Sequence, residues 1–140
     1  MSFELLSDIA DLKMKVSGKT LQELFKDALR GVAFYLQPEV LKSKKKNLLK
    51  EKQKIKVQAA DINSLLIEFL SKILAQADIA STVFIDVSFG IFGENFLEGE
   101  MAGVKVDGFT QEIKAISYER VDIKKSLTSG LYETILVFDI

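Results

Sequence analysis

Carboxylates are the main groups through which this 140-residue chain could do chemistry, because it contains no His and no Cys. Without imidazole and thiolate side chains, the commonest general base and the commonest zinc ligands are missing, so any reaction would depend on Asp, Glu, Lys, Ser, Thr or Tyr. The sequence also lacks a phosphate-binding loop, a dinucleotide-binding glycine pattern and a nucleophile elbow. It therefore predicts a protein that assists another macromolecule and is not itself an enzyme.

One acidic residue has an unusual position. Asp139 lies between Phe138 and Ile140 in an otherwise apolar segment, and a dry, unpaired carboxylate there would be strongly destabilising. The carboxylate of Ile140 adds a second negative charge, and Asp11 stands at the start of the first predicted strand. Oxygen atoms at such strand ends form either a site for a hard cation, such as Ca²⁺ or Mg²⁺, or a solvent-exposed group of acids.

The first half of the chain has the patterns of two strands and two helices. Apolar and polar residues alternate over 10–16 and over 54–59, as in half-buried strands. Thr20 and Glu23 have the spacing of a capping box, and Asp61 is a second candidate N-cap. The helices that follow have these apolar stripes: Leu21, Leu24, Phe25, Ala28, Leu29, Val32, Ala33 and Leu36, closed by Pro38, and then Ile62, Leu65, Leu66, Phe69, Leu70, Ile73, Leu74 and Ala77.

The second half of the chain has the patterns of strands and turns. Segment 82–92 and segment 96–104 predict one hairpin, with Gly99 and Gly103 marking a bulge or a close backbone approach. Segments 112–123 and 131–140 predict another hairpin. The last segment is apolar on both faces from Ile135 to Phe138, which predicts a central strand.

These elements predict an α+β fold of two layers, in which two amphipathic helices pack on one face of a single mixed β-sheet. The composition, with 48% hydrophobic and 28% charged residues, predicts one domain over residues 1–140. The first residues are acidic where a signal peptide would be basic, and no apolar run has the length of a membrane span. We therefore expect a cytoplasmic protein without a membrane partner.

Basic residues are concentrated in one segment, although the net charge is only −1. Eight of the 19 Lys and Arg residues lie in Lys42–Lys56. This segment is either a solvated connection or the working surface of an RNA-binding or chaperone-like module. Arg30 and Arg120 are the only arginines, and no aromatic residue interrupts the Lys run, so direct reading of nucleic acid has little support.

Several sequence blocks together resemble the archease family over nearly the whole chain. They are FELLSDIADLKMKVSGKTLQELFKDALRGVAFYL, ADINSLLIEFLSKIL, EIKAISYERVDI and the final FDI. The most specific parts are Ala10-Asp11 followed by Gly18, the Lys114-Ala115-Ile116 block before Tyr118, and Asp139-Ile140. The resemblance implies a small α+β protein that activates the RtcB-type RNA ligase, the enzyme that joins tRNA halves and other RNA ends with GTP and a divalent metal. This protein would then contact RNA only indirectly, through the ligase complex.

The resemblance also implies a ligand set. The family's metal ligands correspond here to Asp11, Asp139 and Ile140, which would bind a divalent cation, Ca²⁺ first, with Mg²⁺ or Mn²⁺ as alternatives. The chain departs from the family pattern at Asp8, where the family has His, at Glu119, where the family also has His, and at Val104, where the family has Glu. These changes leave both Asp ligands in place and mark the chain as a divergent member.

Overall fold

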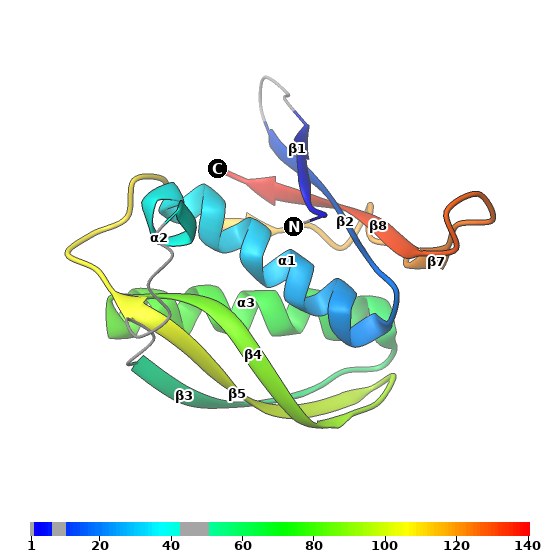
Figure 1. The fold of residues 1–140 in the computed structure, drawn as a ribbon, viewed down its shortest axis with the longest axis horizontal. Helices are drawn as coiled ribbons and strands as arrows, with labels where there is room; N and C mark the ends of the chain where they lie inside the picture. Colours follow the sequence, from blue (N-terminus) through cyan, green and yellow to red (C-terminus); the bar gives the residue numbers. More distant parts are fainter. Residues whose placement is uncertain (1, 7–10, 43–50) are drawn as a thin grey trace.

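The structure, a computed structural model, describes residues 2–6, 11–42 and 51–140, and its two long helices lie between two β-sheets (Figure 1). The helices are α1 (Leu21–Leu36), α2 (Pro38–Lys42) and α3 (Ile62–Ala80). The strands of the first sheet, in spatial order, are β1 (Glu4–Leu6), β2 (Asp11–Gly18), β8 (Tyr132–Asp139) and β6 (Ala115–Ile116), with β7 (Lys124–Lys125) also paired to β8. The second sheet has the order β3 (Glu51–Gln58), β5 (Phe96–Lys105) and β4 (Thr82–Phe92).

The α+β class and both amphipathic helices are confirmed, but the strands do not form the predicted single mixed sheet. All strand pairs among the described residues are antiparallel, and they divide into two sheets. Helix α1 contacts β2 on one side and β4 on the other. Helix α3 is covered on more than one side. Its residue Ile67 is fully buried although it lies outside the predicted apolar stripe, so a second layer must cover it.

Both helices begin at the predicted caps. The Thr20 hydroxyl accepts a hydrogen bond from the Glu23 N–H at 3.1 Å, and the Glu23 carboxylate accepts one from the Lys19 N–H at 3.0 Å. The Asp61 carboxylate accepts a hydrogen bond from the Ser64 N–H at 2.8 Å, which lowers the pKa of Asp61. These side chains satisfy N–H groups that have no partner inside the helix, so local sequence sets where each helix starts.

The β4–β5 hairpin is confirmed, and its glycines lie where two backbones approach closely. A Cβ atom on Gly99 would lie 2.4 Å from the Ser88 carbonyl oxygen, and one on Gly103 would lie 2.3 Å from the Val83 oxygen. The register of β4 against β5 shifts twice, between Phe84 and Asp86 and between Phe89 and Ile91. Glycine is therefore required opposite the two irregularities of β4.

The second predicted hairpin forms only in part. Strand β8 is central in its sheet, as predicted, but segment 112–123 contributes only the two-residue strand β6. Side chains bind much of its remaining backbone: the Asp122 N–H donates to the Thr134 hydroxyl at 2.9 Å and the Ile123 N–H donates to the Asn63 amide oxygen at 2.8 Å. These bonds take the place of a strand ladder, and the prediction of a long strand here was wrong.

Aromatic side chains connect the layers of the core. Phe25 of α1 packs against Phe69 of α3 with ring centroids 5.4 Å apart, and against Phe92 of β4 with centroids 5.0 Å apart in an edge-to-face arrangement. Phe89 of β4 also contacts the Phe69 ring. One cluster therefore joins both helices to the second sheet.

A buried carboxylate anchors the N-terminal segment to α1. Asp27 is only 4% exposed, and its two oxygens accept hydrogen bonds from the N–H groups of Ser2, Phe3 and Ser17, each at 3.0 Å. Three backbone donors from two different segments therefore converge on one side chain of α1. Asp27 was not singled out from the sequence, although an acid beside Leu24 and Ala28 in the apolar stripe is a usable signal for such an anchor.

Some predicted features lie outside the described residues: Asp8 and Ala10, together with Lys44–Lys50 of the basic segment. Across the residues that the structure does describe, no helix has both the length and the apolar character needed to cross a membrane.

Candidate functional site

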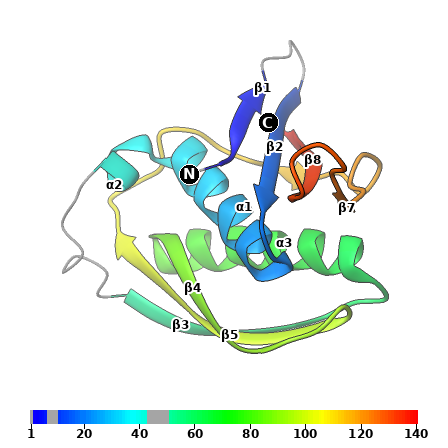
Figure 2. The same cartoon turned by 45° about the vertical axis from the view of Figure 1, so that its right-hand side comes forward.

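Asp11 and Asp139 are direct partners in the pairing of β2 with β8. Directly opposite residues of antiparallel strands have their Cβ atoms about 4.5–5.5 Å apart on the same face of the sheet. That face is the one turned away from the helices, because the neighbouring residues Leu12 and Phe138 are buried against them. Figure 2 shows the end of β8 beside the start of β2. The fold thus brings together two acids that are 128 positions apart in the chain.

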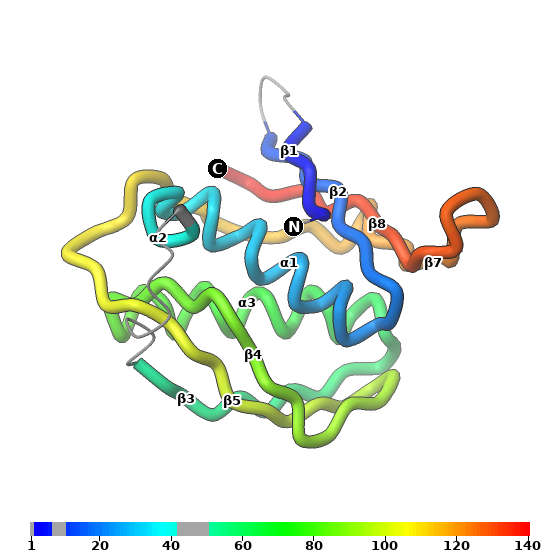
Figure 3. Tube along the Cα trace, in the orientation of Figure 1, coloured from blue at the N-terminus to red at the C-terminus, as the bar shows by residue number. Residues whose placement is uncertain are grey.

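The end of β8 is also fixed from its other side. The Lys114 N–H donates to the Asp139 carbonyl oxygen at 2.7 Å, and Ala115 of β6 is the register partner of Asp139. Figure 3 follows the segment that carries these residues, which runs from β5 past the end of α1 and then along β8. Strands on both sides therefore hold the Asp139 backbone, while its side chain is exposed.

The donor atoms at this site suit a hard cation. Carboxylate oxygens are the ligands that Ca²⁺ prefers, and Ile140, which is 40% exposed, follows Asp139 directly. Among the described residues, no three or more Asp, Glu, His or Cys side chains gather as a metal-binding group. The two Asp side chains would therefore need further oxygens, from the Ile140 carboxylate, from water or from a partner. The role of Asp11, Asp139 and Ile140 as metal ligands stays a prediction.

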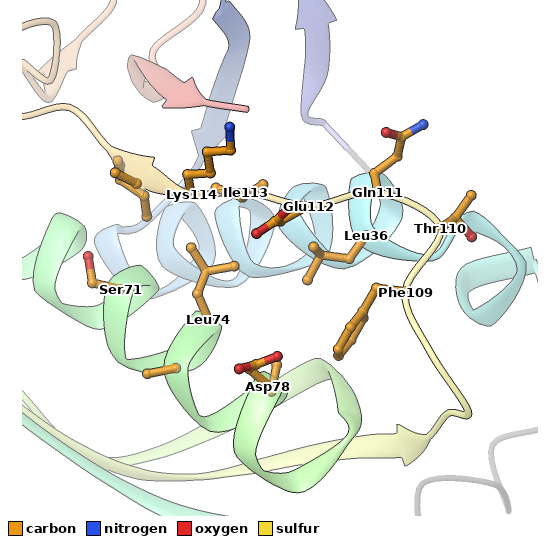
Figure 4. A pocket seen from close by; sticks show the side chains of 14 residues that line it. Leu36, Ser71, Leu74, Asp78, Phe109, Thr110, Gln111, Glu112, Ile113 and Lys114 are labelled. Atoms are coloured by element: carbon orange, nitrogen blue, oxygen red, sulfur yellow. The ribbon is translucent and has the colours of Figure 1, made fainter.

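An open groove is lined in part by strand β6. It has a volume of about 880 Å³ and lies between α3 and segment 109–116 (Figure 4). Leu74 and Phe109 stand on opposite walls, the Asp78 and Glu112 carboxylates lie at the groove, and the Lys114 side chain points away from it. The lining ends at Ala115 and Ile116 of β6, and neither Asp11 nor Asp139 is part of it.

Tyr118 is half exposed, at 51%, and does not belong to the core. Its hydroxyl donates a hydrogen bond to the carboxylate of Glu68 on α3. This bond, followed by burial and by the negative charge of Glu68, raises the pKa of Tyr118 from 10.0 to about 12. The pair joins α3 to the segment that follows β6.

The raised pKa of Tyr118 predicts a pH effect. Because the folded protein favours the protonated phenol, the pair should stabilise the fold below pH 10, and this contribution should be lost as the pH rises toward about 12. An ultraviolet titration should show one tyrosine that ionises near pH 12 while circular dichroism still reports a folded chain. Glu68→Gln should move that step toward pH 10, and Tyr118→Phe should remove it. If no tyrosine of the wild-type protein ionises near pH 12, the hydrogen bond between Tyr118 and Glu68 is contradicted.

The strand part of the basic segment is largely compensated by acids. The Lys56 ammonium lies 2.9 Å from the Glu98 carboxylate, and Lys54 is the register partner of Glu100. Lys56 and Lys54 therefore share their sheet face with acids of β5. This arrangement does not favour RNA binding by the strand part of Lys42–Lys56, and the hypothesis for the whole segment stays a prediction.

The fold defines a small α+β protein, and comparisons with known proteins agree with it. The family model described as Archease protein family (MTH1598/TM1083) matches residues 3–140. The chain belongs to the archease family, as its resemblance predicted.

Individual relatives cover nearly the whole chain. It is 30% identical to Protein archease of Methanosarcina barkeri over 132 residues, which cover 89% of this chain and 87% of that protein. It is 33% identical to Protein archease of Pyrococcus furiosus over 138 residues, which cover 94% of this chain and 93% of that protein.

Solved structures share the fold. The solution structure of Methanobacterium thermoautotrophicum protein 1598 superposes with a TM-score of 0.73 at 20% identity, and covers 99% of this chain and 98% of that one. A crystal structure from Thermotoga maritima, described as an archease and possible chaperone, has a TM-score of 0.66 at 15% identity and covers 98% of both chains.

Proposed function

We propose that this protein is an activator of an RtcB-type RNA ligase and has no catalytic groups of its own. The ligase would form its covalent guanylate intermediate and turn over repeatedly with this protein bound. Membership of the archease family supports the proposal. The observation that carries it is the direct pairing of Asp11 with Asp139, because it places two hard-ligand side chains together on an open sheet face.

The carboxylate pair would act at the surface shared with the ligase. Asp11, Asp139 and the Ile140 carboxylate would hold a divalent cation, Ca²⁺ first and Mg²⁺ or Mn²⁺ as alternatives. A bound cation would supply positive charge at that surface. This chain would hold the carboxylates in position at the strand ends, because β2 and β6 both pair with β8 at Asp139.

A ligation assay tests the proposal. The cognate ligase is assayed with excess RNA ends, GTP and Mn²⁺, with and without this protein, and both guanylylated ligase and joined RNA are measured. We expect stimulation of both products, with joined RNA exceeding one equivalent of ligase only when this protein is present. Equal guanylylation and equal turnover in the two arms would refute the proposal.

A further inference from the structure

A second feature lies on the same open sheet face as the carboxylate pair, four residues further along β2. It is a hollow of about 470 Å³ near the pairing of Lys15 with Ile135, where β7 and the segment before it adjoin β8. At about 3.3 Å per residue, Lys15 is roughly 13 Å from Asp11 along the strand. The hollow, here called the basic hollow, is lined by four cationic side chains: Lys15, Arg120, Lys124 and Lys125.

Two acids in the lining compensate only part of this charge. The Lys124 ammonium lies 3.0 Å from the Asp122 carboxylate, and the Lys15 ammonium lies 3.6 Å from that of Glu133. Lys125 lies over the Tyr132 ring, 5.7 Å from its centroid, which leaves its charge unneutralised. The basic hollow therefore keeps an excess of positive charge on a protein whose net charge is −1.

The two arginines of the chain differ in their surroundings. The Arg30 guanidinium lies 3.6 Å from the Asp86 carboxylate, whereas Arg120 is exposed and forms no ion pair with any residue that the structure describes. A guanidinium with free donors can bind both oxygens of a phosphate group at once. Arg120 is thus the side chain best suited to recognise an anion in the basic hollow.

We propose that the basic hollow binds phosphate groups of an RNA backbone. Among the described residues that line it, only Ile135 is apolar. Protein–protein interfaces have an apolar centre, whereas interfaces with nucleic acid are more polar and rich in positive charge. The lining therefore fits a phosphate backbone better than an acidic protein surface. This inference rests on the proposed function only for the identity of the polyanion, which is taken to be RNA. Activation of the ligase does not itself require direct contact between this protein and RNA.

The positions of the carboxylate pair and the basic hollow imply two separate binding surfaces on one face of the sheet. The acidic end would contact the ligase, and the basic hollow would hold RNA roughly 13 Å away along β2. Since neutralised phosphates release counterions, RNA binding should weaken steeply with salt. Removing two cations from the basic hollow should lower the slope of log affinity against log salt by about 1.4 for single-stranded RNA.

The test compares two variants with the same change of charge. Arg120→Ala/Lys125→Ala alters the basic hollow, and Lys52→Ala/Lys54→Ala alters exposed lysines of β3. Binding of a fluorescent single-stranded RNA to each protein alone is measured between about 50 and 200 mM salt, and thermal unfolding verifies that each variant folds. We expect roughly tenfold weaker binding and a smaller slope for the basic-hollow variant only.

Other results would overturn the inference. Unchanged RNA affinity of the basic-hollow variant would do so, as would a larger loss in the β3 variant, which would point to the basic segment. Guanylylation of the ligase without RNA is measured in parallel. A loss there in the basic-hollow variant, with RNA binding intact, would identify a protein contact in place of RNA. If the wild-type protein gives no stimulation, the proposed function fails while the RNA measurement still decides this inference.

Discussion

Asp11→Asn and Asp139→Asn should each abolish stimulation of the ligase while leaving the fold intact. Each change replaces a charged oxygen ligand with a neutral amide at a site where two carboxylates face each other. Mutation of residues that only orient metal ligands lowers affinity by about 10–100-fold, so loss of a direct ligand should lower cation affinity at least as much. Titration calorimetry with Ca²⁺, Mg²⁺ and Mn²⁺ and the ligation assay measure the two effects.

Stability without metal separates this role from a structural one. Directly opposite like charges destabilise a strand pair, so either Asn variant should unfold at the same or a slightly higher temperature than the wild type when no cation is added. Asp107→Asn, an exposed acid just after β5, serves as the matched control and should retain stimulation. Asp8→Asn extends the comparison, because a true ligand set should show the largest losses at Asp11 and Asp139. Full stimulation by both Asp variants, or no cation binding by the wild type, would show that the metal assignment is wrong.

Asp27→Ala should cause a large loss of stability. The variant leaves the N–H groups of Ser2, Phe3 and Ser17 without their acceptor. A buried donor without a partner costs about 1–3 kcal/mol, and Ser17 is the most buried of the three. Because Ser2 and Phe3 can recover water, we expect a loss on the order of 3 kcal/mol in the free energy of unfolding, measured by urea denaturation.

A half-exposed acid of β4 provides the comparison for Asp27. Asp86→Ala removes the partner of Arg30 from a half-exposed ion pair with a distance of 3.6 Å. Such pairs contribute about 0–1 kcal/mol, so this variant should unfold near the wild-type midpoint. Asp27→Asn should lie between the two, since an amide keeps one acceptor oxygen but places donors against N–H groups. Equal midpoints for Asp27→Ala and Asp86→Ala would contradict the anchoring role.

Local sequence determined the elements whose ends are set by short-range chemistry. Thr20 with Glu23, and Asp61 with Ser64, fix the helix starts through bonds that span three residues. Gly99 and Gly103 marked the close approach of β4 and β5, because only glycine leaves room for a facing backbone. The unbroken apolar run in the last strand predicted its central place, which the pairing of β8 with both β2 and β6 confirms. One face of β8 is nevertheless open and leaves Ile135 37% exposed.

Residue chemistry first marked Asp11 and Asp139, the resemblance to archeases supported them as a ligand set, and the tertiary structure showed that they are paired. Their adjacency depends on the register of β2 with β8, a contact between the two ends of the chain that no local pattern encodes. The same limit applies to the fold: strand periodicity does not say which strands pair, so the division into two sheets was missed.

Asp27 and Arg120 show the same limit for single side chains. Hydrogen bonding distinguishes a buried anchor from a surface acid, and the partners of Asp27 come from segments up to 25 residues away. Arg30 and Arg120 are equivalent in the sequence, and only the fold places Asp86 beside one of them. The sequence alone therefore determined the features that depend on residue type and short-range spacing. Tertiary packing decided the long-range strand register and the partners of charged groups, because the free energy of a charge depends on its neighbours in space.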